Sequence, residues 1–251
     1  MHLVNRVIRR SKMMDILHDM EQLCEPSISL YIRPGDNIET LNIPELHIRG
    51  EENIPPELFI TASRSLTGAI FFWGRSQKYM IMPPFPVMHS SISFDYAIEG
   101  LKSILETNYR IAVILIRLGA YGIGLFEGEK LLESKTGRGL VHSRHKKGGS
   151  SQRRFERHRQ KQIEYFFTRI CERAREKLAP YLQQIDHVYY GGERNTINLF
   201  LKQCDFCARF EGKAAARLLD IRAPGQDSLL RSILEVYSCR AVQATPQDSA
   251  G

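Results

Sequence analysis

The residues that could do chemistry are concentrated in one short segment, which runs from Lys146 to Arg157 with the sequence KKGGSSQRRFER. Gly148 and Gly149 lie inside it, and glycine allows positive φ and a close approach of the backbone to a partner. The basic residues on both sides can neutralise phosphate groups. The segment also leads into a long expected helix, whose first N–H groups favour anions. This composition predicts a contact with a phosphate-rich substrate.

Gln152 is an uncharged amide within this cationic segment. An amide cannot act as a general base, but it can orient a water molecule and donate a hydrogen bond to a developing oxyanion. These properties favour an electrostatic or positional mechanism without a side-chain nucleophile. A mobile hairpin that binds RNA without catalysis is the alternative interpretation, and neither interpretation names the substrate.

The positive charge of the chain is concentrated around the same segment. Between Lys135 and Lys161 there are ten Lys and Arg residues and one acid, Glu156, which together give +9. The whole chain carries +7, so the remainder sums to −2. Such clustering indicates a polyanionic partner, and nucleic acid is the commonest one. A solvated basic face or a disordered arm is the alternative.

Several classes of protein are excluded by other features of the sequence. No run of about 18 apolar residues is present, so no membrane span is expected. The N-terminus mixes basic and apolar residues but lacks the apolar core and cleavage site of a secretory signal. Five cysteines at scattered positions suit reduced thiols in a cytosol better than a disulfide scaffold. We therefore expect a cytoplasmic protein.

Two short motifs could bind a metal, but each is incomplete. Cys204 and Cys207 form a Cys-x-x-Cys pair, whereas a structural zinc site needs four ligands and no second pair with this spacing exists. His142 and His145 have no nearby cysteine or carboxylate to complete a site. Buried thiols and phosphate-contacting or solvated histidines are the preferred interpretations. We expect no metal and no cofactor.

The hydrophobic pattern predicts the elements that position the basic segment. In the first part of the chain we expect a helix at 11–23 and strands at Ser27–Ile32, Ala69–Trp73 and Lys78–Met82. The later elements, in chain order, are a helix at Tyr96–Leu105, strands at Ile111–Leu118, Gly122–Phe126 and Lys130–Ser134, a loop at Thr136–Ser151, a helix from Arg153 to Pro180 with an apolar stripe that includes Phe155, a strand at Ile185–Tyr190, a helix at Thr196–Gln203, a strand at Ala216–Ile221 and a helix at Leu229–Tyr237. A strand meander followed by alternating helices and strands predicts an α/β fold, with a mixed sheet flanked by helices.

The proline-rich run Pro83–Pro86 is the preferred boundary between domains. We expect a small α+β N-terminal domain at 1–85, a second domain at 86–242 that carries the basic segment, and a disordered polar tail at 243–251.

The run GGSSQRRFERHRQ (148–160) resembles the catalytic loop and following helix of the archaeo-eukaryotic class-1 peptide-chain release factors. The middle domain of that family carries Gly-Gly-Gln, two small residues, Arg-Arg-Phe and a charged helix. Gly119–Lys135 is similar to the opening strands of that domain, and Asp186–Lys202 and Ala216–Glu235 are similar to its closing strand and helices. The resemblance covers 92–240 and implies an RNase H-like release-factor middle domain. Ser27–Gly35 more weakly resembles a strand of the family's N-terminal domain.

Three departures from the family pattern point to one branch of it. With Arg153 to Phe155 aligned, the glutamine sits two places later than in Gly-Gly-Gln, and Ser150 occupies its usual position. A Gly-x-x-Gln loop resembles the Vms-type (VLRF) branch, especially its bacterial members, which acts on tRNA in stalled large ribosomal subunits. The N-terminal region has no Asn-Ile-Lys-Ser-like stop-codon reader, and no third domain for a GTPase partner follows. Together these departures imply a rescue factor that does not depend on a stop codon.

The resemblance implies a ribosome-dependent peptidyl-tRNA hydrolase with a defined set of site residues. The catalytic residues are expected to be Gln152, Gly149, Ser150 and Ser151, and the RNA-binding residues Lys146, Lys147, Gly148, Arg153, Arg154, Arg157 and Arg144. The implied partners are the large ribosomal subunit, through the RNA of its peptidyl-transferase centre, and peptidyl-tRNA. We expect a monomer away from the ribosome. A tRNA endonuclease that cuts near the 3′ CCA end and a non-catalytic ribosome- or RNA-binding protein are the alternatives.

Overall fold

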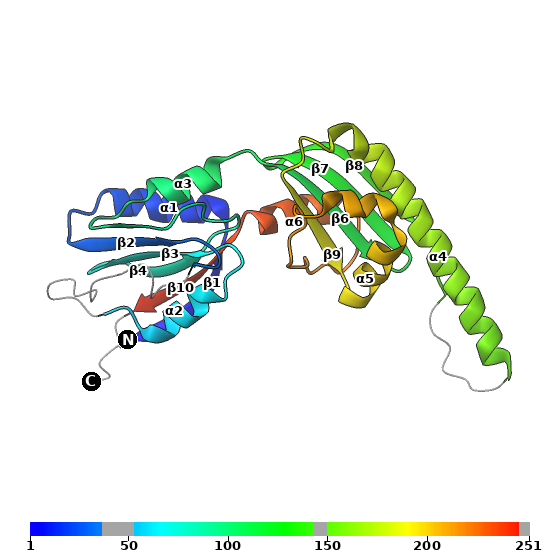
Figure 1. The fold of residues 1–251 in the computed structure, drawn as a ribbon, viewed down its shortest axis with the longest axis horizontal. Coiled ribbons are helices and arrows are strands. Elements are labelled where there is room, and N and C mark those ends of the chain that lie inside the picture. The colour runs from blue at the N-terminus through cyan, green and yellow to red at the C-terminus, as the bar shows by residue number, and fades with distance from the viewer. Residues whose placement is uncertain (37–52, 143–149, 246–251) are drawn as a thin grey trace. The chain divides into compact units, whose positions relative to one another are not determined.

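A computed structural model describes residues 1–36, 53–142 and 150–245 of the chain (Figure 1). The chain forms two compact units, one from Met1–Thr107 with Val236–Gly251 and the other from Asn108–Glu235. The predicted boundary at residue 86 is therefore wrong. Val87 and the helix that follows it, α3 (Glu99–Glu106), pack in the core of the first unit, so the chain leaves that unit only after this helix.

Within the described residues, the first unit contains a six-stranded antiparallel sheet with the order β1-β10-β4-β3-β2-β5. Its strands are β1 (His2–Ile8), β2 (Ser27–Ile32), β3 (Ala69–Gly74), β4 (Lys78–Met82), β5 (Ser91–Ser93) and β10 (Cys239–Thr245). Its helices are α1 (Arg10–Glu21), α2 (Pro56–Ser63) and α3. The predictions for α1, β2, β3 and β4 are confirmed to within two residues.

Helices cover both faces of this sheet. Side chains alternate along each strand, so both faces carry apolar side chains that the helices bury. On β3, Ile70 and Phe72 face the cluster that contains α1 and α3, whereas Phe71 and Trp73 face the cluster that contains α2. All four of these strand side chains are fully buried. A strand that is apolar at every position is therefore explained by helical layers on both sides.

Three strands of the first sheet, β1, β5 and β10, were not predicted. β10 lies between β1 and β4 and pairs with both, with Val242 opposite Asn5 on one side and Met80 on the other. The expected disordered tail at 243–251 is corrected by this pairing, since residues up to Thr245 belong to the strand. The remaining tail residues, 246–251, lie outside the described residues.

The second unit contains, in its described part, a four-stranded mixed sheet with the order β8-β7-β6-β9. Its strands are β6 (Arg110–Arg117), β7 (Ala120–Glu127), β8 (Lys130–Arg138) and β9 (His187–Gly192). Its helices are α4 (Ser150–Leu178), α5 (Arg194–Gln203) and α6 (Gln226–Val236), with a short 3₁₀ helix at Asp205–Phe210 after α5. Strands β6, β7 and β8 form the predicted antiparallel meander, and β9 runs parallel to β6. The predicted α/β class with a mixed sheet flanked by helices is confirmed.

Helices α4 and α5 cover one face of this sheet, and α6 covers the other (Figure 1). Phe166 and Ile170 of α4 and Phe200 of α5 belong to the core cluster on the first face. On the opposite face Leu229 of α6 packs against the glycines of β7, since a Cβ at Gly124 would lie 3.2 Å from Leu229 Cδ2.

The predicted strand at Ala216–Ile221 is wrong, because this part of the chain, from Ala214 on, meets the sheet only at isolated bridges. Ala214 forms a parallel bridge with Val188, and Leu219 forms one with Gly191. Between these two bridges the chain does not maintain continuous pairing with β9. Within the described part of the chain, no helix combines the length and apolar character that a membrane crossing requires.

Candidate functional site

α4 carries the described part of the predicted site, and its first turns extend beyond the core of the second unit (Figure 1). Among the described side chains of this helix, Ile163 is the first that is buried. Residues 150–162 precede it and extend roughly 20 Å along the helix axis beyond this first buried residue. Within this stretch, His158, Arg159 and Gln162 contact the chain at His142. Phe155, predicted to belong to the buried stripe, is instead 58% exposed because it lies on this projecting part.

α4 begins at Ser150, three residues earlier than predicted. Serine is favoured at helix starts, and glutamine and arginine are good helix formers, so helical geometry can begin immediately after Gly149. Gln152 therefore lies in the first turn, where backbone N–H groups have no partner within the helix. The first turn contains no acidic residue. The N–H groups and the following arginines consequently create a region of positive potential.

Gln152 makes a specific hydrogen bond on the helix surface. Its Nε2 donates to Oε1 of Glu156 at 3.0 Å, and both side chains are exposed. The bond leaves the carbonyl oxygen of Gln152 and its second amide hydrogen able to contact a water molecule or a substrate. From the sequence, Glu156 was counted only as the single acid of the basic stretch and was given no role beside Gln152. The four-residue spacing on a helix is the signal that could have revealed it.

The other predicted site residues fall into three groups. Arg153, Arg154 and Arg157 are exposed on the projecting turns of α4. Ser150 and Ser151 begin the helix, but their side chains lie outside the description. The remaining predicted residues lie outside the described residues altogether: Arg144, Lys146, Lys147, Gly148 and Gly149.

The chain is fixed to α4 at the point where it approaches the basic segment. The backbone N–H of His142 donates to Oε1 of Gln162 at 3.2 Å, and Nε of Arg159 donates to the carbonyl of His142 at 2.9 Å. The His142 and His158 rings also lie close together, with centroids 6.2 Å apart. The chain is therefore held against α4 at His142, the last described residue before α4 begins at Ser150.

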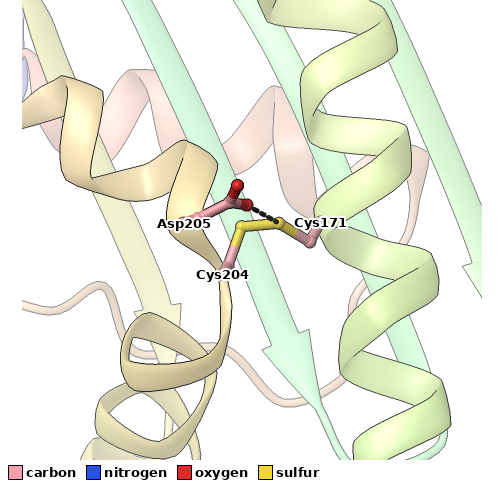
Figure 2. Close-up of side chains that lie close together, drawn as sticks. All are labelled: Cys171, Cys204 and Asp205. Carbon is pink, nitrogen blue, oxygen red and sulfur yellow. Dashed lines mark hydrogen bonds between the residues drawn. A yellow bond between two sulfur atoms is a disulfide. The ribbon is translucent and has the colours of Figure 1, made fainter.

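A disulfide links Cys171 of α4 to Cys204 at the end of α5 (Figure 2). The expectation that all five cysteines are reduced thiols is therefore wrong. The reason is tertiary, since packing of α4 against α5 places two cysteines 33 residues apart in sequence with their Cα atoms 5.4 Å apart. Both sulfur atoms are consumed by the bond, and the nearby Asp205 carboxylate accepts hydrogen bonds from Arg175 at 2.8 and 3.0 Å. This cluster acts as a cross-link between helices.

Cys207, the second cysteine of the Cys-x-x-Cys pair, is buried as a free thiol. Its Sγ lies 3.5 Å from that of Cys204. Burial raises the pKa of the Cys207 thiol to about 11, although a hydrogen bond with Tyr190 acts in the opposite direction. A protonated buried thiol is a poor nucleophile and a poor metal ligand.

The chain is similar to several known proteins of one kind. The chain is 24% identical over 258 residues to peptide chain release factor subunit 1 of Aeropyrum pernix, an alignment that covers 91% of this chain and 69% of that protein. It is 26% identical over 255 residues to peptide chain release factor subunit 1 of Picrophilus torridus, with coverages of 90% and 62%. The crystal structure of the archaeal translation termination factor aRF1 is also similar, with a TM-score of 0.40, 22% identity, and coverages of 91% of this chain and 72% of that chain. These are release factors of translation.

A match to a family model shows which family of release factors the chain belongs to. The model for the Actinobacteria/chloroflexi VLRF1 release factor, acVLRF1, matches residues 109–241, which span the four-stranded sheet, α4, α5 and α6. The chain belongs to this release-factor family. The resemblance to the VLRF branch, drawn from the Gly-x-x-Gln segment, is thereby confirmed.

Proposed function

We propose that the chain is a ribosome-dependent, stop-codon-independent peptidyl-tRNA hydrolase that releases nascent chains from stalled large ribosomal subunits. The observation that carries the proposal is the position of Gln152. This residue lies in the exposed first turn of a helix that projects roughly 20 Å beyond its core and follows the Gly148-Gly149 pair. A narrow projection of this kind suits a site that must enter a confined RNA-lined cavity.

The reaction needs one water molecule and a polarised ester. The water oxygen attacks the ester carbonyl carbon, the bond to the ribose oxygen breaks, and the proton from water ends on that oxygen. Gln152 orients the water with its side-chain amide, and backbone N–H groups of the first turn stabilise the tetrahedral oxyanion. Gly149, Ser150 and Ser151 are assigned to the same backbone approach, with no side chain acting as nucleophile.

The cationic residues around the helix start hold the loop against RNA. Arg153, Arg154 and Arg157 are exposed on the first turns of α4. Arg144, Lys146 and Lys147 lie close to them in sequence and add positive charge, and Gly148 is assigned a backbone contact. Neutralisation of phosphates by such a cluster is independent of base sequence and weakens with salt. The proposed partners are the RNA of the peptidyl-transferase centre and peptidyl-tRNA, which would place the protein in the cytoplasm.

Peptide release from purified large subunits that carry peptidyl-tRNA tests the proposal. Wild-type protein should release the peptide, and Gln152→Ala should lower the rate by about 100-fold or more, the usual effect of removing an oxyanion or water-positioning donor. Ribosome binding should change little. Release by Gln152→Ala at the wild-type rate would remove this residue from the mechanism.

Gln160→Ala is a matched control on the same helix. Nε2 of Gln160 donates to Oε1 of Glu164 at 3.1 Å, which repeats the arrangement of Gln152 and Glu156 two turns further on. This variant should release the peptide normally. The 3′ terminus of the released tRNA separates the two enzymatic alternatives, since an intact CCA end means ester hydrolysis and a shortened tRNA means nuclease action.

A further inference from the structure

A groove lies where the end of β8 meets α4 in the second unit. It encloses about 470 Å³, and its lining consists of Gly139, Leu140, His158, Lys161, Gln162, Tyr165, Phe166 and Arg169. The absence of a side chain at Gly139 allows the chain to approach the buried Phe166, because a Cβ there would lie 2.5 Å from the Phe166 ring. None of the described residues that line the groove is acidic.

Three lining residues form a row along α4. Lys161, Tyr165 and Arg169 follow one another at intervals of four, so they lie on the same helix face. Tyr165 is 68% exposed, so its ring is accessible to a ligand. The guanidinium carbon of Arg169 lies 6.0 Å from the centre of the Tyr165 ring. The groove therefore combines an exposed aromatic ring, one face of which Arg169 approaches, with a second cation, Lys161, one turn before it.

We propose that this groove binds an unpaired nucleotide of single-stranded RNA, with the base stacked on Tyr165 and the phosphate against Lys161 and Arg169. Unpaired bases stack on tyrosine and on arginine planes, whereas bases inside a duplex cannot reach them. His158 and the exposed Leu140 supply a further imidazole and an apolar contact at the rim. The cations alone would suit any polyanion, and the exposed ring beside them specifies one with aromatic bases.

The groove is distinct from the proposed catalytic turn. Tyr165 lies 13 residues after Gln152 on the same helix, which is a distance of roughly 20 Å along the axis. The nucleotide in the groove is therefore not the one that carries the ester. The proposal rests on the proposed function, since it gives the same helix a second RNA contact that holds α4 while its first turn acts.

Fluorescence anisotropy with a short labelled single-stranded RNA tests the groove directly on the full chain. Tyr165→Ala should weaken binding by about tenfold, the usual effect of losing one stacked base, and Tyr165→Phe should bind like the wild type. Lys161→Ala should weaken binding and reduce its salt dependence. Phe94→Ala, which removes a 76% exposed aromatic residue of the first unit, and Lys202→Ala, on α5, are the matched controls and should bind normally.

A tryptophan at the same position gives a second readout. Trp73 is the single tryptophan of the chain and is fully buried, so it contributes a constant background. The fluorescence of Tyr165→Trp should be quenched by single-stranded RNA and unaffected by duplex RNA or heparin. Equal responses to single strands and heparin, or Tyr165→Ala binding as tightly as Phe94→Ala, would overturn the proposal.

Two further comparisons interpret these outcomes. RNAs with and without a 3′ CCA end distinguish the tRNA terminus from other single strands as the source of the nucleotide. Binding that depends on Tyr165 together with absent peptide release would support the groove and reject the proposed hydrolase. Peptide release that requires Gln152, together with RNA binding that is unchanged in Tyr165→Ala, would support the proposed hydrolase and reject the groove as a nucleotide site.

Discussion

Gln152 and Glu156 are joined by a hydrogen bond of 3.0 Å on an exposed helix surface, and this contact makes position 156 informative. An exposed pair one turn apart contributes only about 0.2–0.5 kcal/mol, so its loss should change release by about twofold. Glu156→Gln keeps an acceptor for the Gln152 amide and should release like the wild type, while Glu156→Ala should be about twofold slower. The measurement is single-turnover peptide release from purified large subunits.

The same two variants decide whether Glu156 has a larger role. A carboxylate that accepted the proton of the attacking water would make both substitutions slower by about 100-fold or more. Glu164→Ala removes the equivalent partner of Gln160 and provides the control. Equal and large losses in Glu156→Gln and Glu156→Ala would contradict the positional role assigned here and favour general-base catalysis.

His187 of β9 links the stability of the second unit to pH. Burial lowers the pKa of His187 below its ordinary value of 6.5, although Asp186 acts in the opposite direction. The folded imidazole therefore stays neutral at pH values where the unfolded one has taken up a proton. The unfolded state binds more protons, so the free energy of unfolding should fall as pH drops below about 6.5.

Urea unfolding at neutral and mildly acidic pH measures this effect. His187→Phe keeps the ring contact with Tyr109, whose centroid lies 5.1 Å away, and should show a smaller loss of stability on acidification. His89→Phe alters an exposed histidine of the first unit and is the matched control. An identical pH profile for His187→Phe and wild type would contradict the assignment to His187.

At the scale of elements, the cross-link between α4 and α5 predicts a response to reductant. The bond between Cys171 and Cys204 closes a sequence separation of 33 residues, for which chain entropy gives about 3–4 kcal/mol of stabilisation. Reduction of the wild type should lower its free energy of unfolding by up to this amount. Cys171→Ser should be destabilised to a similar extent and should no longer respond to reductant.

Urea unfolding with and without reductant checks this expectation, and alkylation followed by mass measurement counts the free thiols. Cys24→Ser removes an exposed free cysteine and should behave like the wild type. Coincident unfolding curves for oxidised and reduced wild type would show that the bond contributes nothing to stability.

The elements that the sequence predicted well are those with strong local patterns. The apolar run of β6 and the long stripe of α4 both depend on neighbouring residues, so periodicity located them. β1 and β10 have no comparable pattern, since Arg6 and Arg240 are exposed members of strands whose pairing joins opposite ends of the chain. The cross-link was missed for the same reason, because only the packing of α4 on α5 brings Cys171 and Cys204 together.

The candidate site also has features that depend on local sequence and features that depend on tertiary packing. The proposed roles of Gln152 and of the arginines after it were predicted from residue type and local spacing. The roughly 20 Å projection of α4 and the groove at Tyr165 could not be predicted, because both depend on where the sheet ends beneath the helix. Tertiary structure therefore adds the reach of the helix and its second candidate contact.

At the scale of the whole molecule, the chain leaves the first unit after Thr107 and returns to it at Val236. The second unit is thus one continuous segment, whereas the first is completed only by β10. That strand is not peripheral, since it pairs with β1 on one side and with β4 on the other. The first unit should therefore depend on the last described residues of the chain, and the second should not.

Truncation of the chain tests whether the first unit needs β10 and whether the second unit folds without it. A chain that ends after Ser238 lacks β10, which exposes the edge of β4 and removes the only described sheet partner of β1. Trp73 is the single tryptophan and lies in the core of the first unit, so its emission reports that unit alone. The truncated chain should show a red-shifted tryptophan and no cooperative fluorescence transition in urea. Its far-ultraviolet helical signal, to which the 29 residues of α4 contribute, should still unfold cooperatively.

A chain that ends after Thr245 retains β10 and should match the full-length protein in both signals. If the chain that ends after Ser238 keeps a buried tryptophan, the first unit folds without its C-terminal strand, which would contradict the dependence expected from the pairing of β10.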